Sequence, residues 1–265
     1  MGVFDSGVGG LTVLREIRRV LPGESTLYLG DTARVPYGTK SQATIIRYSR
    51  QNTRILSERG IKLLVVACNT ASALAMEALR HDFDFPMTGV IEPGAEAAAK
   101  TSRTKKIGVI GTSATVRSAA YTAALQARNA QLQVISKACP LFVSLAEEGW
   151  TEGEVAEPAA RKYLESFQGS GIDVLLLGCT HYPLLRSVIS KVMGEGISII
   201  DSAKATAEQV SKLLAARKLA APAGSPPKHR YLVTDSRERF LDLAPRFLGG
   251  SLEGDVEEVG VPGDD

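Results

Sequence analysis

Several features are scarce or missing in this chain of 265 residues. It has only three cysteines, three histidines and one tryptophan. The cysteines, at positions 68, 139 and 179, form neither a CxxC pair nor a Cys/His metal spacing, so a disulfide framework and a metal site lack their usual signals. We expect a reduced, cytoplasmic protein with free thiols. No P-loop, HExxH or GxSxG pattern occurs, which removes the signals of phosphoryl transfer, zinc hydrolysis and nucleophile-elbow chemistry.

Charge imbalance and long apolar runs are missing too. The 31 lysines and arginines are scattered and balanced by 29 acids, so we expect no nucleic-acid partner. No stretch approaches the roughly 18 uncharged apolar residues of a membrane span. The first residues show neither the basic nor the apolar segment of a secretory signal, and we expect no membrane partner. What remains, 44% hydrophobic and 23% charged, is the composition of an ordinary soluble enzyme.

Short apolar runs alternate with helix-like stretches along most of the chain, which predicts an α/β fold with mostly parallel sheets flanked by helices. Strands are predicted at Gly2–Phe4, Thr26–Leu29, Leu63–Ala67, Thr88–Ile91, Ile107–Ile110, Leu132–Ile135, Val174–Leu177, Ile197–Ile200, Tyr231–Val233 and Val256–Val259. Helices are predicted at Gln42–Arg59, Ala71–Arg80, Ala114–Arg128, Glu154–Phe167, Leu184–Met193, Ala203–Arg217 and Ser236–Phe247. Residues 221–227 have the composition of a surface loop, and the acidic tail over 253–265 is expected to fray.

Two parts of the chain echo each other. A strand followed by a small, hydroxyl-bearing turn begins at Gly2 and again at Gly108. The apolar runs that precede Cys68 and Cys179 are separated by a similar number of residues. Near-equal offsets predict two pseudo-symmetric lobes, each with a mostly parallel sheet, and an active site in the cleft between them. We expect residues 1–92 plus 206–265 to form the first lobe and residues 93–205 to form the second.

Cys68 and Cys179 each come directly after an apolar run that is typical of a buried parallel strand. The carboxyl ends of such strands are where open α/β sheets bind ligands. We therefore predict that the two thiols face one site from two lobes, one acting as an acid and the other as a base on a carbon. Cys139 has no such position, and we interpret it as a buried structural residue.

Polar residues that can begin a helix follow both of these thiols. Asn69 or Thr70 can cap a helix after the first cysteine, and Thr180 can cap one after the second, with Pro183 in its first turn. A helix amino terminus lowers the pKa of a thiol from about 8.5 toward neutrality. This position is therefore expected to make each thiol a usable base.

Other polar groups follow the predicted strands. Asp5 can orient a thiol, accept its proton or bind a substrate ammonium, and it can equally be a helix cap. Gly7–Gly10 either lets the backbone approach an anion or forms a tight turn, and it does not fit GxGxxG. His181 can pair with a thiol or donate to an anion, or be an ordinary loop histidine. Residues 31–38 form a polar loop whose N–H groups can hold a carboxylate.

Six ordered motifs together resemble the glutamate racemases of the aspartate/glutamate racemase superfamily: residues 3–10, 30–38, 67–72, 111–116, 139–143 and 178–183. The resemblance covers nearly the whole chain. It implies a pseudo-symmetric two-lobed α/β fold. The enzyme that it implies is an isomerase that needs no pyridoxal phosphate, no other cofactor and no metal. It also implies conversion of L-glutamate to D-glutamate for bacterial peptidoglycan. We expect a homodimer, whose geometry the sequence does not give.

The resemblance further implies roles for single residues. Cys68 would deprotonate D-glutamate and Cys179 would deprotonate L-glutamate, each reprotonating the face that the other attacks. Asp5 would assist Cys68, His181 would assist Cys179, and Glu147 matches a carboxylate that the family has near the site. The substrate-binding positions would be Asp5, Ser6, Tyr37, Gly38, Asn69, Thr70, Thr180 and His181, with Thr115 near the ligand.

Three other functions remain open at this stage. An aspartate or hydantoin racemase is the nearest alternative, although His181 favours glutamate because aspartate-type relatives tend to have an acid there. A single-thiol decarboxylase of the same superfamily needs only one of the two cysteines. A two-lobed solute-binding protein could share the cleft, but it has no need of two thiols at matching strand ends, and a fold alone does not decide function.

Overall fold

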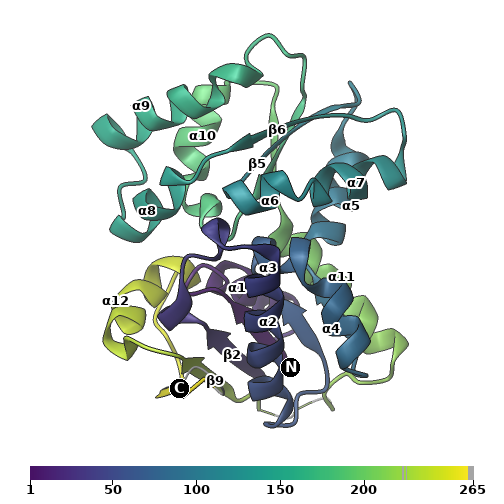
Figure 1. Ribbon diagram of the computed structural model, residues 1–265, viewed down its shortest axis with the longest axis vertical. Helices are drawn as coiled ribbons and strands as arrows, with labels where there is room; N and C mark the ends of the chain where they lie inside the picture. Colours follow the sequence, from purple (N-terminus) through teal and green to yellow (C-terminus); the bar gives the residue numbers. More distant parts are fainter. Residues whose placement is uncertain (223, 225, 262–265) are drawn as a thin grey trace.

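The computed structural model describes residues 1–222, 224 and 226–261, which form two lobes (Figure 1). The lower lobe in Figure 1 contains a six-stranded parallel sheet of order β10-β9-β2-β1-β3-β4, and the upper lobe contains a four-stranded parallel sheet of order β6-β5-β7-β8. Helices flank both sheets, so the predicted fold class is confirmed. The strands are β1 (Gly2–Asp5), β2 (Thr26–Gly30), β3 (Leu64–Val66), β4 (Met87–Gly89), β5 (Lys106–Gly111), β6 (Gln133–Ala138), β7 (Val174–Gly178), β8 (Ser198–Asp201), β9 (His229–Val233) and β10 (Asp255–Glu258).

Twelve α-helices and four short 3₁₀ helices connect these strands in the described ranges. Within the same part of the chain, no helix has the length and apolar composition of a membrane span. The α-helices are α1 (Leu11–Val20), α2 (Gln42–Ser57), α3 (Asn69–Leu74), α4 (Met76–Asp82), α5 (Ile91–Thr101), α6 (Ser113–Arg117), α7 (Ala120–Arg128), α8 (Leu141–Glu148), α9 (Gly153–Leu164), α10 (Arg186–Met193), α11 (Ser202–Ala216) and α12 (Arg237–Leu248). The 3₁₀ helices are η1 (Thr32–Arg34), η2 (Tyr37–Thr39), η3 (Glu165–Phe167) and η4 (Tyr182–Leu185).

All ten predicted strands are found, but the helices differ from the prediction in several places. Helices α1, α5 and α8 were not predicted, and two predicted helices are each divided in two. The second division falls at Ala119, whose φ of 53° is left-handed. There the Ser118 hydroxyl donates to Thr115 O and accepts from Ala120 N, so a side chain replaces helical backbone bonds.

The prediction for the acidic tail was wrong over part of its length. Strand β10 pairs in parallel with β9, so the residues from Asp255 to Glu258 extend the sheet instead of fraying. Residues 262–265 of the tail, and residues 223 and 225 of the predicted surface loop, lie outside the described residues.

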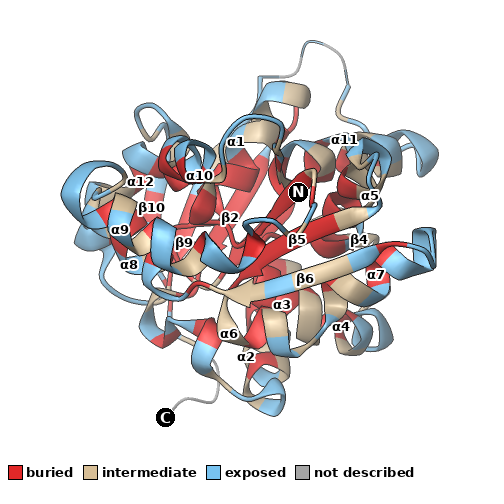
Figure 2. Cartoon of the chain, turned by 90° about the horizontal axis from the view of Figure 1, so that it is seen from above, coloured by how far each residue is buried: buried red, intermediate tan, exposed pale blue. Residues whose placement is uncertain are grey.

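The two sheets repeat one topology. The order β2-β1-β3-β4 in the first is matched by β6-β5-β7-β8 in the second, and β9 and β10 extend the first sheet at one edge. Strands β3 and β7 therefore occupy equivalent positions. Every residue of β1, β3 and β7 is buried, which explains their unbroken apolar runs, whereas the edge strand β6 is tan and pale blue in Figure 2.

Chain crossings between the lobes run through two helices. The predicted lobe boundary at 92/93 falls within α5, and the boundary at 205/206 falls within α11. The strands of the first sheet come from residues before 90 and after 228, and those of the second sheet from residues 106–201. The exact boundaries stay a prediction.

The carboxyl ends of the central strands face each other across the lobe interface. Thr12 Oγ1 of the first lobe donates to Thr180 O of the second at 3.0 Å. The Thr70 and Thr112 hydroxyls are 2.9 Å apart across the same interface. A Cβ on Gly38 would lie 2.7 Å from Thr112 Cβ, so this close approach needs a glycine. The lobes are thus held in contact around the strand ends that carry the two cysteines.

Candidate active site

A small cavity lies between the lobes, at the carboxyl ends of their central strands. Its volume is about 30 Å³, room for one or two water molecules. Both Cys68 and Cys179 line it. Nine of the eleven predicted site residues are in its lining, and Asp5 and Glu147 are outside it. The lining consists of Ser6, Val35, Pro36, Tyr37, Gly38, Cys68, Asn69, Thr70, Thr112, Val143, Cys179, Thr180 and His181.

Cys68 connects β3 to α3 and is itself the N-cap residue, so neither Asn69 nor Thr70 has the predicted capping role. Burial, and then the negative charge of Asp5, raise the pKa of Cys68 to about 12. Hydrogen bonds from the backbone of Ala71 and the side chain of Ser6 act in the opposite direction but do not outweigh burial. The prediction that the helix start lowers the pKa of this thiol was therefore wrong, because burial has the larger effect.

Asp5 ends β1 and is completely buried beside the cavity lining. Its carboxylate accepts from Gly7 N at 3.0 Å and from Thr180 Oγ1, in the other lobe, at 3.4 Å. Burial raises the pKa of Asp5, and the charge of His181 opposes that shift. A Cβ on Gly10 would lie 2.4 Å from Asp5 Cβ, so the turn after β1 requires a glycine at that position. Asp5 is therefore buried next to the cavity lining without being part of it.

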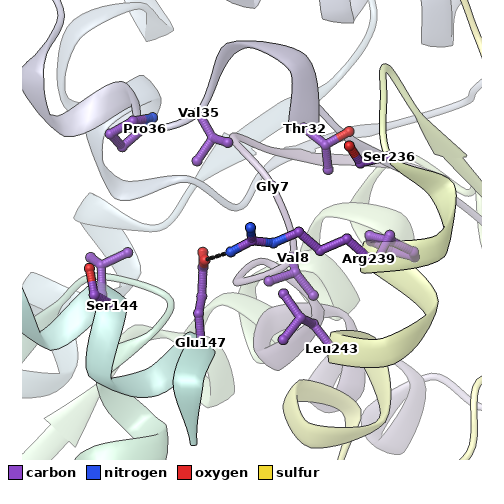
Figure 3. Close-up of a pocket in the computed structure, with 12 residues that line it drawn as sticks. Gly7, Val8, Thr32, Val35, Pro36, Ser144, Glu147, Ser236, Arg239 and Leu243 are labelled. Atoms are coloured by element: carbon purple, nitrogen blue, oxygen red, sulfur yellow. Dashed lines mark hydrogen bonds and ion pairs between the residues drawn. The ribbon is translucent and has the colours of Figure 1, made fainter.

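Cys179 follows β7 of the second lobe and lines the cavity, and polar side chains are connected to it one after another. Its Sγ lies 3.9 Å from His181 Nδ1, and His181 Nε2 lies 3.1 Å from Glu147 Oε1. Arg239 of α12 donates to Glu147 Oε2 at 3.1 Å, and Figure 3 shows this pair meeting across the lobe interface. No α-helix begins at Thr180. The chain instead enters η4, with His181 as its N-cap residue.

The protonation of His181 follows from these contacts. Burial alone would lower the pKa of His181, but its hydrogen bonds to Cys179 and Glu147, together with nearby negative charge, raise that pKa to about 10. The hydrogen bond from His181 in turn lowers the pKa of Glu147. A positively charged imidazole therefore lies next to one of the two thiols at neutral pH.

Replacing Glu147 by glutamine is expected to lower the pKa of His181, because the imidazolium loses its carboxylate partner. An NMR titration of the His181 ring protons measures this directly. Glu148→Gln is the matched control, since it removes the same charge from an exposed neighbour. An unchanged His181 titration in Glu147→Gln would show that Glu147 does not set the charge of this ring.

The side-chain amide of Asn69 is buried, and only its oxygen has a hydrogen-bond partner among the described residues. Its Oδ1 accepts from Tyr121 OH at 2.7 Å, whereas its Nδ2 has no hydrogen-bond partner among the described residues. Leaving a buried donor unpaired is costly, so this amide suits a ligand that supplies an acceptor. Thr70 next to it shares hydrogen bonds with Thr112 and Thr115, and Thr115 lies behind the lining rather than in it.

A buried network holds the loop that carries Tyr37 and Gly38. Asp31 is fully buried and receives the Arg34 guanidinium, the Asn52 amide and the Tyr37 hydroxyl. The Tyr37 hydroxyl is thus engaged inside its own lobe. The predicted role of the loop backbone at the site stays a prediction. In the structure, Asp31 holds the loop in place through these three contacts.

A larger outer pocket of about 320 Å³ adjoins the cavity and shares Val35, Pro36 and Val143 with it. Glu147 and Arg239 both line this outer pocket (Figure 3). Sequence reasoning singled out neither Arg239 nor Thr112 as a site residue. Thr112 had a signal, since it matches Ser6 in the internal repeat, whereas nothing local marks Arg239.

Cys139 is fully buried and lies outside the cavity lining, within the largest hydrophobic cluster. All three cysteines are free. Over the described ranges, no group of three or more His, Cys, Asp or Glu side chains is arranged to hold a metal ion. The titratable side chains in the cavity lining are the two thiols, His181 and Tyr37, and Asp5 and Glu147 lie outside the lining.

Known proteins share both this sequence and this architecture. Residues 7–210 match the family described as Asp/Glu/Hydantoin racemase. A glutamate racemase of Geobacter metallireducens is 53% identical over 261 residues, which cover 98% of this chain and 96% of that protein. A glutamate racemase isoform from Bacillus anthracis has a TM-score of 0.94 at 42% identity, covering 98% and 97% of the two chains. The Francisella tularensis glutamate racemase, solved in complex with D-glutamate, has a TM-score of 0.92 at 36% identity, with coverages of 98% and 97%. The chain belongs to the Asp/Glu/hydantoin racemase family.

Proposed function

We propose that this chain interconverts L-glutamate and D-glutamate by two-base proton transfer at Cα, using Cys68 and Cys179 and no cofactor. Glutamate racemases that are 36% to 53% identical over nearly the whole chain support the substrate, and one of them holds D-glutamate. The single observation that carries the mechanism is that two buried thiols line one cavity from equivalent positions in two lobes.

Two bases are needed because a single base tends to return the proton to the face from which it came. In the L-to-D direction, Cys179 takes the α-proton as a thiolate, and the Cys68 thiol donates its own proton to the opposite face of Cα. The raised pKa of Cys68, about 12, supports its role as the protonated partner in this direction. The reverse direction exchanges the two roles.

Stabilising the carbanion is the harder task, because the α-proton is very weakly acidic. As that proton leaves, negative charge passes into the α-carboxylate, which gains enolate character. Asn69 lines the cavity and has a buried Nδ2 that no described residue pairs with, and Ser6, Thr70 and Thr180, which carry hydroxyls, line the same space. Donors that are already oriented need no reorganisation during the reaction, so they favour the charged intermediate.

His181, Glu147 and Asp5 support the thiols without touching Cα in this proposal. His181 keeps a positive charge next to Cys179, and Glu147 holds that imidazole through its second nitrogen. Asp5 raises the pKa of Cys68 and bonds Thr180 of the other lobe. Each is thereby a positioning or electrostatic partner of one thiol.

Substrate entry requires the lobes to move apart. A cavity of about 30 Å³ is far smaller than an amino acid, so the structure corresponds to a closed site. The outer pocket of about 320 Å³ next to it offers a route from solvent. Closure around the substrate excludes water and strengthens the electrostatic contacts inside.

Solvent deuterium exchange tests the function directly. In D₂O, each glutamate enantiomer is expected to incorporate deuterium at Cα as optical rotation is lost, because the thiols exchange their protons with solvent. Aspartate and a hydantoin are run as alternative substrates and are expected to react far more slowly. Heat of glutamate binding without exchange would instead indicate a solute-binding protein, and faster turnover of aspartate would reassign the substrate.

The same proposal extends to the cellular setting. We propose that the D-glutamate supplies peptidoglycan synthesis, that the protein is cytoplasmic, and that two copies form a homodimer. The three free cysteines suit a reducing compartment. The exposed apolar side chains of Leu141, Trp150 and Val155, near α8 and α9, supply surface that a second copy can cover.

A further inference from the structure

Tyr121 reaches from α7 of the second lobe to the site residues of the first. Its hydroxyl donates to Asn69 Oδ1 at 2.7 Å, and its side chain is only 3% exposed. Asn69 directly follows Cys68 and lines the cavity, whereas Tyr121 does not line it. One buried hydrogen bond thus joins the second lobe to a lining residue beside a thiol.

The donor and acceptor pattern around this hydroxyl fixes the orientation of the Asn69 amide. Burial raises the pKa of Tyr121, so its hydroxyl keeps its proton and can donate. The side chain of Ser202, at the start of α11, lies close enough to this hydroxyl to counter part of that rise in pKa. The tyrosine proton is directed at Asn69 Oδ1, and Nδ2 is the half of the amide that has no hydrogen-bond partner among the described residues.

The aromatic ring of Tyr121 is itself held by close backbone approach on two sides. A Cβ on Gly178, the residue before Cys179, would lie 2.9 Å from Tyr121 Cε2. A Cβ on Gly94 of α5 would lie 3.4 Å from the Tyr121 hydroxyl. Because glycines leave room for the ring at both points, Tyr121 has little freedom to move its hydroxyl away from Asn69.

We propose that Tyr121 is a positioning residue for the racemase site: it holds the Asn69 amide so that Nδ2 donates to the substrate carboxylate. The proposal rests on the proposed function for the identity of that carboxylate. It explains why a buried amide nitrogen has no partner in the described part of the chain while the oxygen of the same amide accepts a hydrogen bond at 2.7 Å. It also makes the carboxylate contact of the first lobe depend on a residue of the second, so the contact is complete only when the lobes are closed.

Removing the hydroxyl alone tests this role. In Tyr121→Phe, the KM for both glutamate enantiomers is expected to rise roughly tenfold, with kcat within about threefold of wild type, because Asn69 stays in the lining but its amide is no longer held ready for the carboxylate in the ground state. In an Asn69→Ala background, adding Tyr121→Phe is expected to change kcat/KM by less than about twofold, since both changes remove the same contact.

Two control variants separate positioning from stability. Ser202→Ala changes a side chain next to the same hydroxyl but keeps the bond to Asn69, and its KM is expected to stay within about twofold of wild type. Tyr231→Phe removes a buried tyrosine hydroxyl that pairs with Arg18, away from the site. It is expected to shift the thermal midpoint without changing KM.

A second measurement does not depend on turnover. The Asn69 side-chain amide resonances of the wild-type protein, assigned by their loss in Asn69→Ala, are expected to shift when glutamate is added. Tyr121→Phe is expected to move the same resonances in the ligand-free protein. A wild-type protein that does not racemise glutamate would overturn the proposed function, while these ligand-free resonances would still decide whether Tyr121 holds Asn69.

Three results would overturn the proposal. One is a KM in Tyr121→Phe within about twofold of wild type. Another is an undiminished effect of that substitution in the Asn69→Ala background, which would show that Tyr121 acts through general stability. The third is an Asn69 amide signal that does not respond to glutamate in the wild-type protein.

Discussion

Cys68→Ser and Cys179→Ser are each expected to abolish racemisation, with a loss of at least about a thousandfold in kcat for both directions. A serine hydroxyl is a far weaker acid than a thiol, so the variant has neither a base at that face nor a ready proton donor. Losing one face stops both directions, because every turnover uses both thiols. Circular dichroism of the glutamate solution follows the reaction from either enantiomer.

The fold is expected to survive both changes. Cys68 and Cys179 are buried but border a cavity, and serine has nearly the same shape as cysteine, so the thermal midpoint should stay within a few degrees. Cys139→Ala is the matched control: it removes the third buried thiol, which lies outside the cavity, and it is expected to retain turnover. Wild-type turnover in either serine variant would rule out the two-base assignment.

The architecture could be predicted from sequence because it rests on local signals. Continuous apolar runs such as the one ending at Gly178 are typical only of strands buried on both faces, and all ten strands were found. The similar offsets within the repeat pointed to equivalent positions for Cys68 and Cys179. Helix breaks were harder to predict, because the left-handed φ at Ala119 depends on the hydrogen bonds of the Ser118 side chain.

The lining of the site was predictable for a similar reason. Parallel strands bring their carboxyl ends to one edge of a sheet, so residues just after β1 and β3 had to gather at one edge of the first sheet, and those just after β7 at the matching edge of the second. Contacts between lobes gave no such signal. Arg239 and Tyr121 lie far along the chain from Glu147 and Asn69, and only the folded chain brings each pair together.

The wrong expectation for the pKa of Cys68 shows the limit of local reasoning about charge. A helix start contributes a favourable dipole, and that much can be read from the sequence. The burial of the thiol beside another acid cannot be predicted from the local sequence, because Asp5 is brought to the thiol only by the pairing of β1 with β3. The penalty for burying a thiolate outweighs the benefit of the dipole, and burial therefore favours the protonated form of this thiol.

Gly9→Ala is expected to lower kcat/KM roughly a hundredfold, the scale of loss that follows a displacement of about 1 Å in a catalytic group. A Cβ at this position would lie 2.4 Å from both His181 Nδ1 and Thr180 Oγ1. Real contacts of that length do not occur, so either the His181 ring or the whole second lobe must shift. A shift of the ring disturbs the 3.9 Å contact between His181 and Cys179, and a shift of the lobe carries Cys179 away from Cys68.

Neighbouring glycines distinguish this effect from a general cost of adding a methyl group. In Gly7→Ala the nearest atom to the new Cβ would be Val35 Cγ2 at 3.9 Å, an ordinary contact, so activity should change only a few-fold. In Gly10→Ala the clash is with Asp5 of the same lobe, and the expected loss is in thermal stability. Gly9→Ala clashes only with the other lobe, so its thermal midpoint should change less than that of Gly10→Ala while its activity falls far more than that of Gly7→Ala. Equal activity in the Gly7 and Gly9 variants would mean that the site works without the close approach of the two lobes seen here.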